Sequence, residues 1–246
     1  MDNSFGGFVK HAGYRMMTDP FYAIGILDDV VGAKNAKVLM PLVAYSASKA
    51  QRGEKLAAAD PSNTKLRRGQ AVGHFNVAIV SAKLGDTRTA LDSSRKAQSI
   101  LAGMLSADPQ NDDFRQGLAT IQTFVCEMMI KTGEASEAIK LLSQSLLTLE
   151  KSFTASPTDE IAHFRIAITQ ENLGQGFANL ASESKTPVQK RLIHWREARS
   201  WFLKSQAIYK VFNEAGKLVG EDATRLVTVT EGIAKCDAAI ARLTGN

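Results

Sequence analysis

Three stretches of this chain stand in register: AADPSNTKLR at 58–67, SADPQNDDFR at 106–115 and TASPTDEIAH at 154–163. Their prolines, Pro61, Pro109 and Pro157, recur with a period of 48 (109 − 61 and 157 − 109). Two residues after each proline comes asparagine or aspartate, whose side-chain oxygen commonly accepts a hydrogen bond from the first turn of a helix. The sequence therefore predicts a repeat in which a new helix starts once per period, after Asn63, Asn111 and Asp159.

A second signal repeats with the same period, because LGDTRTA at 84–90 is matched by TGEASEA at 132–138. Glycine at the second position of each segment suits the left-handed residue that ends many helices. Alanine closes each segment, at Ala90 and Ala138, near the start of the second helix. A larger side chain there would push paired helices apart, and overpacking typically costs ~1–3 kcal/mol. Each unit is thus expected to hold a helix, a glycine turn, a second helix and a proline turn.

Apolar residues at spacings of three and four support helices throughout, and no stretch alternates with a period of two. The pattern predicts an all-α chain without strands. The expected helices cover 39–58, 64–84, 87–106, 112–132, 135–155, 160–181, 194–212 and 221–243.

The third unit departs from the period. Ala198 follows Ala138 at a spacing of 60 rather than 48, which indicates an insertion at 182–193. The segment at 221–243 is predicted to be a C-terminal capping helix, since the end of a repeat stack needs a polar outer face. The expected organisation is a degenerate N-terminal helical cap at 1–35, followed by a repeat domain of about four units at 36–246.

The composition excludes several classes of protein. With 246 residues, 44% of them hydrophobic and 22% charged, the chain is long and apolar enough for a core. Two cysteines rule out a disulfide framework or a four-cysteine zinc site. No basic and apolar leader begins the chain, and no apolar run reaches the ~18 residues of a membrane span. The expected location is cytoplasmic, and the net charge of +5 permits an anionic partner without requiring one.

These repeats resemble tetratricopeptide repeats, in an unusually long version found in bacterial signalling proteins. The segments HWREARSWFLKSQAIYK at 194–210 and GEDATRLVTVTEGIAKCDAAIARL at 220–243 resemble the tail that follows the kinase domain in some bacterial serine/threonine protein kinases. The resemblance covers 36–244 and implies a right-handed superhelix of antiparallel helix hairpins. The chain departs from the family in two ways. The Trp-Leu-Gly-Tyr signature of the first helix of each unit is poorly kept, and the usual tyrosine of the second helix is replaced by Ser94 and Leu142.

Motifs for catalysis are missing. The sequence has no GxxxxGK[ST] phosphate loop, no kinase glycine-rich loop, no HRD and no DFG. The GxG in LGQGFA at 173–178 follows a helix rather than a strand, so it does not indicate nucleotide binding. The four histidines are scattered, and Cys126 lies among apolar residues that favour a buried, unreactive thiol. We therefore expect no catalytic residue, no metal and no cofactor, and a protein that is not an enzyme.

The resemblance to peptide-binding tetratricopeptide proteins suggests four site residues on the first helix of each unit, along the concave face. Asn76 and Asn172 lie two periods apart, and Lys83 and Lys131 lie one period apart. In that family, asparagine at such places holds a peptide backbone and lysine holds a carboxylate. The set is incomplete because Phe124 takes the place of asparagine in the middle unit. The alternative is a solvated polar face without a fixed ligand.

A basic run at 185–210 carries Trp195, Trp201 and Phe202. Basic residues interleaved with aromatics can bind nucleic acid through phosphate contacts and stacking. Because Trp201 and Phe202 adjoin Ala198 on the buried pattern, core aromatics beneath a solvated basic face are the favoured interpretation.

The sequence thus predicts a protein–protein interaction scaffold or sensor module of a bacterial signalling system, with a protein or peptide partner and no membrane contact. Two alternatives stay open: the regulatory C-terminal region of a serine/threonine protein kinase polypeptide, and a nucleic-acid-associated regulator.

Overall fold

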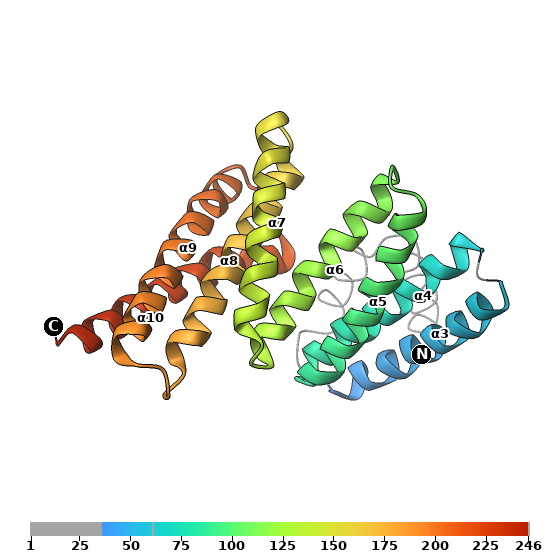
Figure 1. Cartoon of the computed structure of the whole chain (residues 1–246), viewed down its shortest axis with the longest axis horizontal. Helices are drawn as coiled ribbons and strands as arrows, with labels where there is room; N and C mark the ends of the chain where they lie inside the picture. Colours follow the sequence, from blue (N-terminus) through green and yellow to red (C-terminus); the bar gives the residue numbers. More distant parts are fainter. Residues whose placement is uncertain (1–35, 61, 246) are drawn as a thin grey trace, which may run out of the picture. The chain divides into compact units, whose positions relative to one another are not determined.

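A computed structural model of the chain describes residues 36–60 and 62–245, and all regular structure in that part is helical (Figure 1). The all-α prediction is confirmed. The α-helices are α3 (Ala36–Ala59), α4 (Thr64–Lys83), α5 (Thr87–Ala107), α6 (Asp112–Lys131), α7 (Ala135–Ala155), α8 (Glu160–Ser182), α9 (Val188–Glu214) and α10 (Arg225–Thr244), with one 3₁₀ turn, η1 (Gly220–Thr224), before α10.

The predicted helix caps are confirmed at all three repeats. The side-chain oxygen of Asn63 accepts a hydrogen bond from the backbone N–H three residues later, at 3.2 Å. Asn111 makes the same bond at 3.2 Å, and Asp159 makes it at 2.9 Å. Each cap satisfies one of the backbone donors left free at a helix start. Pro109 and Pro157 lie in the linkers just before these caps, as predicted, whereas Pro61 lies outside the described residues.

The predicted glycine turns are confirmed as well. Gly85 has φ +83° and Gly133 has φ +92°, both in the left-handed region that side chains rarely adopt. The N–H of the next residue then bonds a carbonyl five residues back, from Asp86 to Ser81 at 2.9 Å and from Glu134 to Met129 at 2.8 Å. This closure ends α4 and α6 and turns the chain back into α5 and α7.

The second helices of the repeats, α5, α7 and α9, share one register. Each of these helices has one fully buried alanine at the equivalent position. It is Ala90 in the first turn of α5, Ala138 in the first turn of α7, and Ala198 further along α9. Four residues further on, a second buried position follows in each helix, occupied by Ser94, Leu142 and Phe202. The period read from the sequence therefore matches the burial in the structure, across the insertion.

The structure refines two boundaries. Within the insertion at 182–193, α9 already begins at Val188, directly after Pro187. The sequence predicts a C-terminal helix from residue 221, but α10 begins at Arg225, because 220–224 form the 3₁₀ turn. The earlier helix expected at 39–58 is confirmed as α3, and the expected cap at 1–35 lies outside the described residues.

Contacts between residues divide the chain into two compact units, unit 1 (Met1–Met128) and unit 2 (Met129–Asn246), with the boundary inside α6. In unit 1, α4 packs against both α3 and α5. The α3 and α4 backbones approach closely, since a Cβ at Gly73 would stand 3.0 Å from the Cα of Ala50. Phe75 lies in this core and meets Phe124 edge-on, with ring centroids 5.4 Å apart.

In unit 2, α8 packs against α7 and α9, and α10 covers another side of α9 (Figure 1). The Phe202 ring lies between Gly174 of α8 and Gly232 of α10. The hydroxyl of Ser205 donates to the carbonyl of Ala167 at 2.9 Å, a buried bond between α9 and α8. These contacts set the antiparallel register of α8 and α9, which decides what α9 presents to solvent.

Candidate functional site

The first pair of predicted site residues lies on one face of α4 in unit 1. Asn76 is half-buried, and Lys83, the last residue of the helix, follows seven residues later. The Asn76 Oδ1 atom is buried and has no hydrogen-bond partner in the described part of the chain. A buried acceptor left without a donor costs ~1–3 kcal/mol. Because this oxygen is enclosed by protein, a ligand that brings an N–H group would reach it only after neighbouring side chains move.

The middle repeat does not continue this row of amides. Phe124, at the place equivalent to Asn76, contributes its ring to the core through the contact with Phe75. That position therefore has a packing role.

The second pair, Lys131 and Asn172, belongs to unit 2. Asn172 sits mid-way along α8 with 8% of its surface exposed, and Lys131 is the exposed last residue of α6. The four predicted residues thus fall two and two in separate units, rather than in one described cluster.

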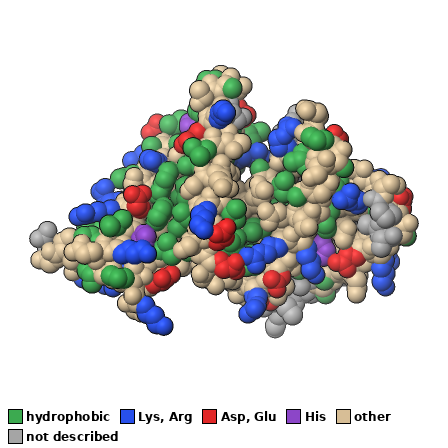
Figure 2. Space-filling view, viewed as in Figure 1, with side chains coloured by type: hydrophobic (Ala, Val, Ile, Leu, Met, Phe, Trp, Pro, Cys, Tyr) green, Lys and Arg blue, Asp and Glu red, His purple; other side chains and the backbone are tan. Residues whose placement is uncertain are grey.

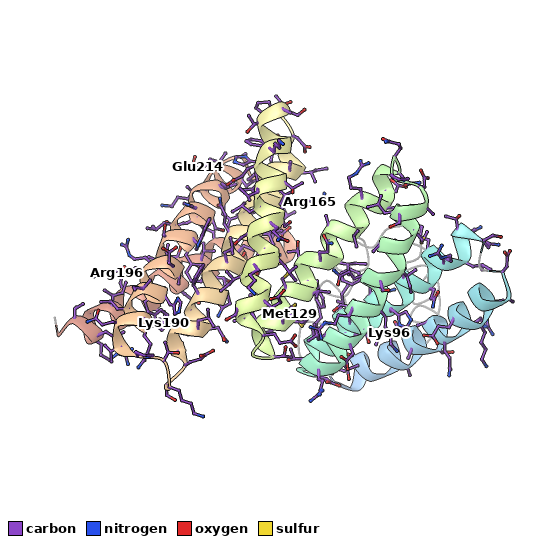
Figure 3. All side chains as sticks on the ribbon, viewed as in Figure 1. Lys96, Met129, Arg165, Lys190, Arg196 and Glu214 are labelled. Carbon is purple, nitrogen blue, oxygen red and sulfur yellow. The ribbon has the colours of Figure 1, made fainter. Side chains whose placement is uncertain are left out.

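Two residues of α8 that the sequence pattern did not single out extend the polar face around Asn172. Arg165 and Asn179 lie seven residues before and after Asn172, so all three share one side of the helix. Both are half-buried, and Figure 3 labels Arg165. Burial lowers the pKa of the Arg165 guanidinium, against the opposite influence of Asp159.

Only one of these two residues had a signal in the sequence. Asn179 stands where Lys83 and Lys131 stand in the earlier repeats, so the same period could have found it. Arg165 replaces glycines at 69 and 117, and nothing in the pattern marks it.

The two lysines also have a local structural reason to be where they are. Lys83 and Lys131 each end a helix, where a cation interacts favourably with the partial negative charge of the helix C-terminus. Both also interact with other groups of the protein.

The two cysteines and His74 are buried. Cys126 and Cys236 are buried, as the sequence predicts for Cys126, and burial raises the pKa of each thiol to about 11. At neutral pH both are therefore protonated and poor nucleophiles. His74 Nε2 lies 3.1 Å from Glu54 Oε1. Within the described residues, no group of three or more histidine, cysteine or acidic side chains could hold a metal ion.

The aromatics of the basic run mostly belong to the core, as predicted. Trp195 and Phe202 are buried, whereas Trp201 is half-buried. The Lys204 ammonium lies 4.0 Å above the Trp201 ring, a cation–π contact. These rings therefore do not form an open platform for stacking bases.

Unit 1 has a small crevice between α4, α5 and α6, with a volume of about 50 Å³. Its walls are mainly apolar, with Arg68 and Asp113 as the charged members. Sites for small organic ligands measure roughly 300–1,000 Å³, so this crevice is too small for such a ligand.

Comparisons with known proteins do not assign the chain to a family. No protein-family model and no curated protein matches it. One solved structure that it resembles is the crystal structure of BtubC (BKLC) from P. vanneervenii, at 14% identity over 87% of this chain and 94% of that chain. The TM-score is 0.37, and no conclusion rests on so weak a likeness. In the described part, no helix is long and apolar enough to cross a membrane.

Proposed function

We propose that this chain is a non-catalytic protein-interaction module, built as a tetratricopeptide-like right-handed superhelix of antiparallel helix hairpins. The support is the recurrence of the asparagine or aspartate cap and the buried alanine in all three repeats, and of the left-handed glycine in the first two. A helix pair of this kind buries only part of its apolar surface, and stacking of pairs supplies the rest.

The proposed ligand is an extended peptide on the concave face, formed by the first helices of the repeats. The observation that carries this is the Asn76 Oδ1 atom, buried on α4 without a partner among the described residues. A peptide backbone alternates N–H and C=O groups, so once the side chains that enclose the Asn76 oxygen move aside it can supply the missing donor and also accept from the amide. On α8, the polar face of Arg165, Asn172 and Asn179 offers the same chemistry with a cation beside it.

The proposed setting is the cytoplasm of a bacterium, with the module acting as a scaffold or sensor in signalling. This rests on the resemblance of the repeats and of the C-terminal segment noted above. The protonated thiols and the lack of nucleotide-binding motifs in the sequence favour a binding role over catalysis.

The test is selection of peptides from a random library on the full chain, followed by calorimetric titration of the best peptide. Asn76→Ala and Asn172→Ala, made singly and together, should each weaken binding by ~1–3 kcal/mol, because a buried peptide group loses its partner. Gln144→Ala, at an exposed position of α7, is the matched control and should bind like the wild type.

Two results would contradict the proposal. A selected peptide that binds the double variant as tightly as the wild type removes the asparagine face as its site. Turnover of ATP by the purified chain would contradict the non-catalytic role.

A further inference from the structure

The side of α9 that points away from the core carries large apolar side chains. Of the ten large hydrophobic side chains exposed among the described residues, nine belong to unit 2. Three of them, Ile193, Leu203 and Val211, are 57%, 37% and 56% exposed on α9. They lie on the side of the helix opposite Ala198 and Phe202, which are buried against unit 2.

We define the α9 outer face by the exposed residues that share this side: Ile193, Arg196, Ser200, Leu203, Ala207 and Val211. Ser200 and Ala207 are small and alternate with the larger apolar side chains. Small residues between large ones leave room for the side chains of a second helix.

The repeat itself shows that this apolar character is not required by the fold. Aligning α5, α7 and α9 on their buried alanines shows which positions of the three helices are equivalent. At the places of Ser200, Leu203, Ala207 and Val211, helix α5 has Asp92, Arg95, Ser99 and Gly103, and helix α7 has Lys140, Ser143, Leu147 and Lys151. All of these positions are exposed. A polar outer face therefore serves α5 and largely serves α7, whereas α9 is apolar there.

Charged side chains flank the apolar positions on α9, and cations predominate. Lys190, Arg196, Lys204 and Lys210 are exposed, against the carboxylates of Glu197 and Glu214. Arg199 is paired with Asp237 of α10, and Lys204 lies over Trp201. In the described part of the chain, no ion pair is formed by Lys190, Arg196 or Lys210. Figure 2 shows basic and apolar side chains together over α9, and Figure 3 labels Lys190, Arg196 and Glu214 along the helix.

We propose that the α9 outer face docks an acidic amphipathic helix of a partner protein. The apolar side of that helix covers Ile193, Leu203 and Val211, and its flanking carboxylates pair with Arg196 and Lys210. The stripe from 193 to 211 is about 27 Å long at 1.5 Å per residue, which corresponds to about five turns of the partner.

A lipid surface fits these features less well. Ser200 and Ala207 interrupt the apolar stripe, which leaves no continuous apolar side to enter the acyl region. Helices that lie on membranes carry a broader apolar side with Trp, Phe and Leu.

This surface is separate from the asparagine face of α4 and α8, so the inference does not depend on the proposed peptide site. Loss of one site by substitution leaves the other to be measured.

The experiment uses the full chain and a fluorescein-labelled synthetic helix with leucine on one side and glutamate on both flanks. The helix is about 20 residues long and spans about 30 Å, enough to cover the stripe. Anisotropy at low salt should show saturable binding that weakens as salt is added, because the flanking charges are screened.

Substitutions on α9 then separate the apolar contacts from the charged ones. Leu203→Ser with Val211→Ser should weaken binding at least about tenfold, since two apolar contacts are lost. Arg196→Ser with Lys210→Ser should weaken it about three- to tenfold at low salt. Leu147→Ser, at an exposed apolar position on α7, is the control and should leave binding unchanged.

Circular dichroism melts check that each variant is folded. If the Leu203→Ser, Val211→Ser variant unfolds at a lower temperature, the Arg196→Ser, Lys210→Ser variant still tests the proposal. The proposal is overturned if the wild type does not bind the glutamate helix saturably, or if the same helix with lysine in place of glutamate binds equally well. Unchanged binding by both double variants overturns it too. Binding to phosphatidylserine vesicles without binding to the glutamate helix would assign the face to lipid instead.

Discussion

The ring of Phe202 on α9 lies directly against the backbone of Gly174 on α8. A Cβ atom added at residue 174 would stand only 2.7 Å from the Phe202 Cδ1 atom. This contact brings the two helices of the third repeat close together, and the hydrogen bond from Ser205 to the carbonyl of Ala167 secures it further along.

Gly174→Ala should therefore destabilise the protein. Displacing the ring by overpacking typically costs ~1–3 kcal/mol, and the better helix propensity of alanine returns about 1 kcal/mol, so a net loss of up to about 2 kcal/mol is expected. The control is Gly69→Ala on α4. A Cβ atom at residue 69 would meet nothing within 4 Å, so this substitution should stabilise the helix. Urea unfolding of both variants is the measurement. Equal shifts in the two variants would show that the Phe202 contact does not constrain residue 174.

The buried alanines of the second helices allow a test of the repeat register. Ala138 is fully buried, whereas Ser136 is exposed two residues earlier on α7. Ala138→Leu should cost ~1–3 kcal/mol through overpacking, and Ser136→Leu should be nearly neutral. Denaturant melts that give the same loss for both would disprove this placement of the helix.

A largely buried hydrogen bond joins α8 to α9. The Tyr209 hydroxyl donates to Glu171 Oε2 at 2.7 Å, and Arg225 Nη1 donates to the same oxygen at 3.0 Å. Tyr209→Phe should destabilise the protein by about 1.5–3 kcal/mol, the usual contribution of a hydrogen bond to a charged group. Urea unfolding of the variant beside the wild type measures this loss.

A double-mutant cycle with Glu171→Gln checks that the energy belongs to this pair. The effect of Tyr209→Phe should shrink in the Glu171→Gln background, where the acceptor is no longer charged. An unchanged effect would assign the loss to packing of the ring instead.

Acid should weaken unit 1 through His74. Burial lowers the pKa of His74 from its ordinary value of 6.5, with Lys96 acting in the same direction and Glu54 in the opposite one. Because the unfolded chain then binds the proton more tightly than the folded chain, stability is full above pH 6.5 and falls as the pH drops through that value. Melting temperatures of the wild type and of His74→Asn between pH 8 and pH 5 provide the measurement.

The variants separate His74 from the other shifted histidine. Burial and then Lys190 lower the pKa of His194 too, so His194→Asn serves as a parallel control in unit 2. Glu54→Gln should steepen the acid loss, since it removes the group that raises the pKa of His74. If His74→Asn is as sensitive to acid as the wild type, His74 is not the group responsible.

Helix starts and stops could be predicted from the sequence because their causes are local. The caps at Asn63, Asn111 and Asp159 are hydrogen bonds between residues three apart, and the turns at Gly85 and Gly133 depend on one backbone angle each. Residues this close in the chain meet whatever the rest of the fold does. The buried alanines could be predicted from the same period, because each lies at the equivalent position of its repeat.

The candidate site was predicted only in part. Counting by the period located Asn76 and Asn172 on α4 and α8, and the same counting could have found Asn179. It could not show that the Asn76 Oδ1 atom is buried without a partner among the described residues, because that depends on side chains from other helices. Arg165 has no counterpart in the other repeats, so only the structure drew attention to it.

For the described part of the chain, the amino-acid sequence by itself determined that the regular structure is helical, where most helices begin and end, and which alanines are buried. Tertiary packing decided which side of each helix meets solvent and which distant residues meet one another. Tyr209 and Glu171 lie far apart in the sequence and pair only through the antiparallel register of α8 and α9. On α9, Trp201 and Phe202 share one apolar pattern, yet only Phe202 is buried, because α8 and α10 cover its side of the helix. An apolar periodicity gives the spacing of the faces, and the neighbouring helices decide which face is covered.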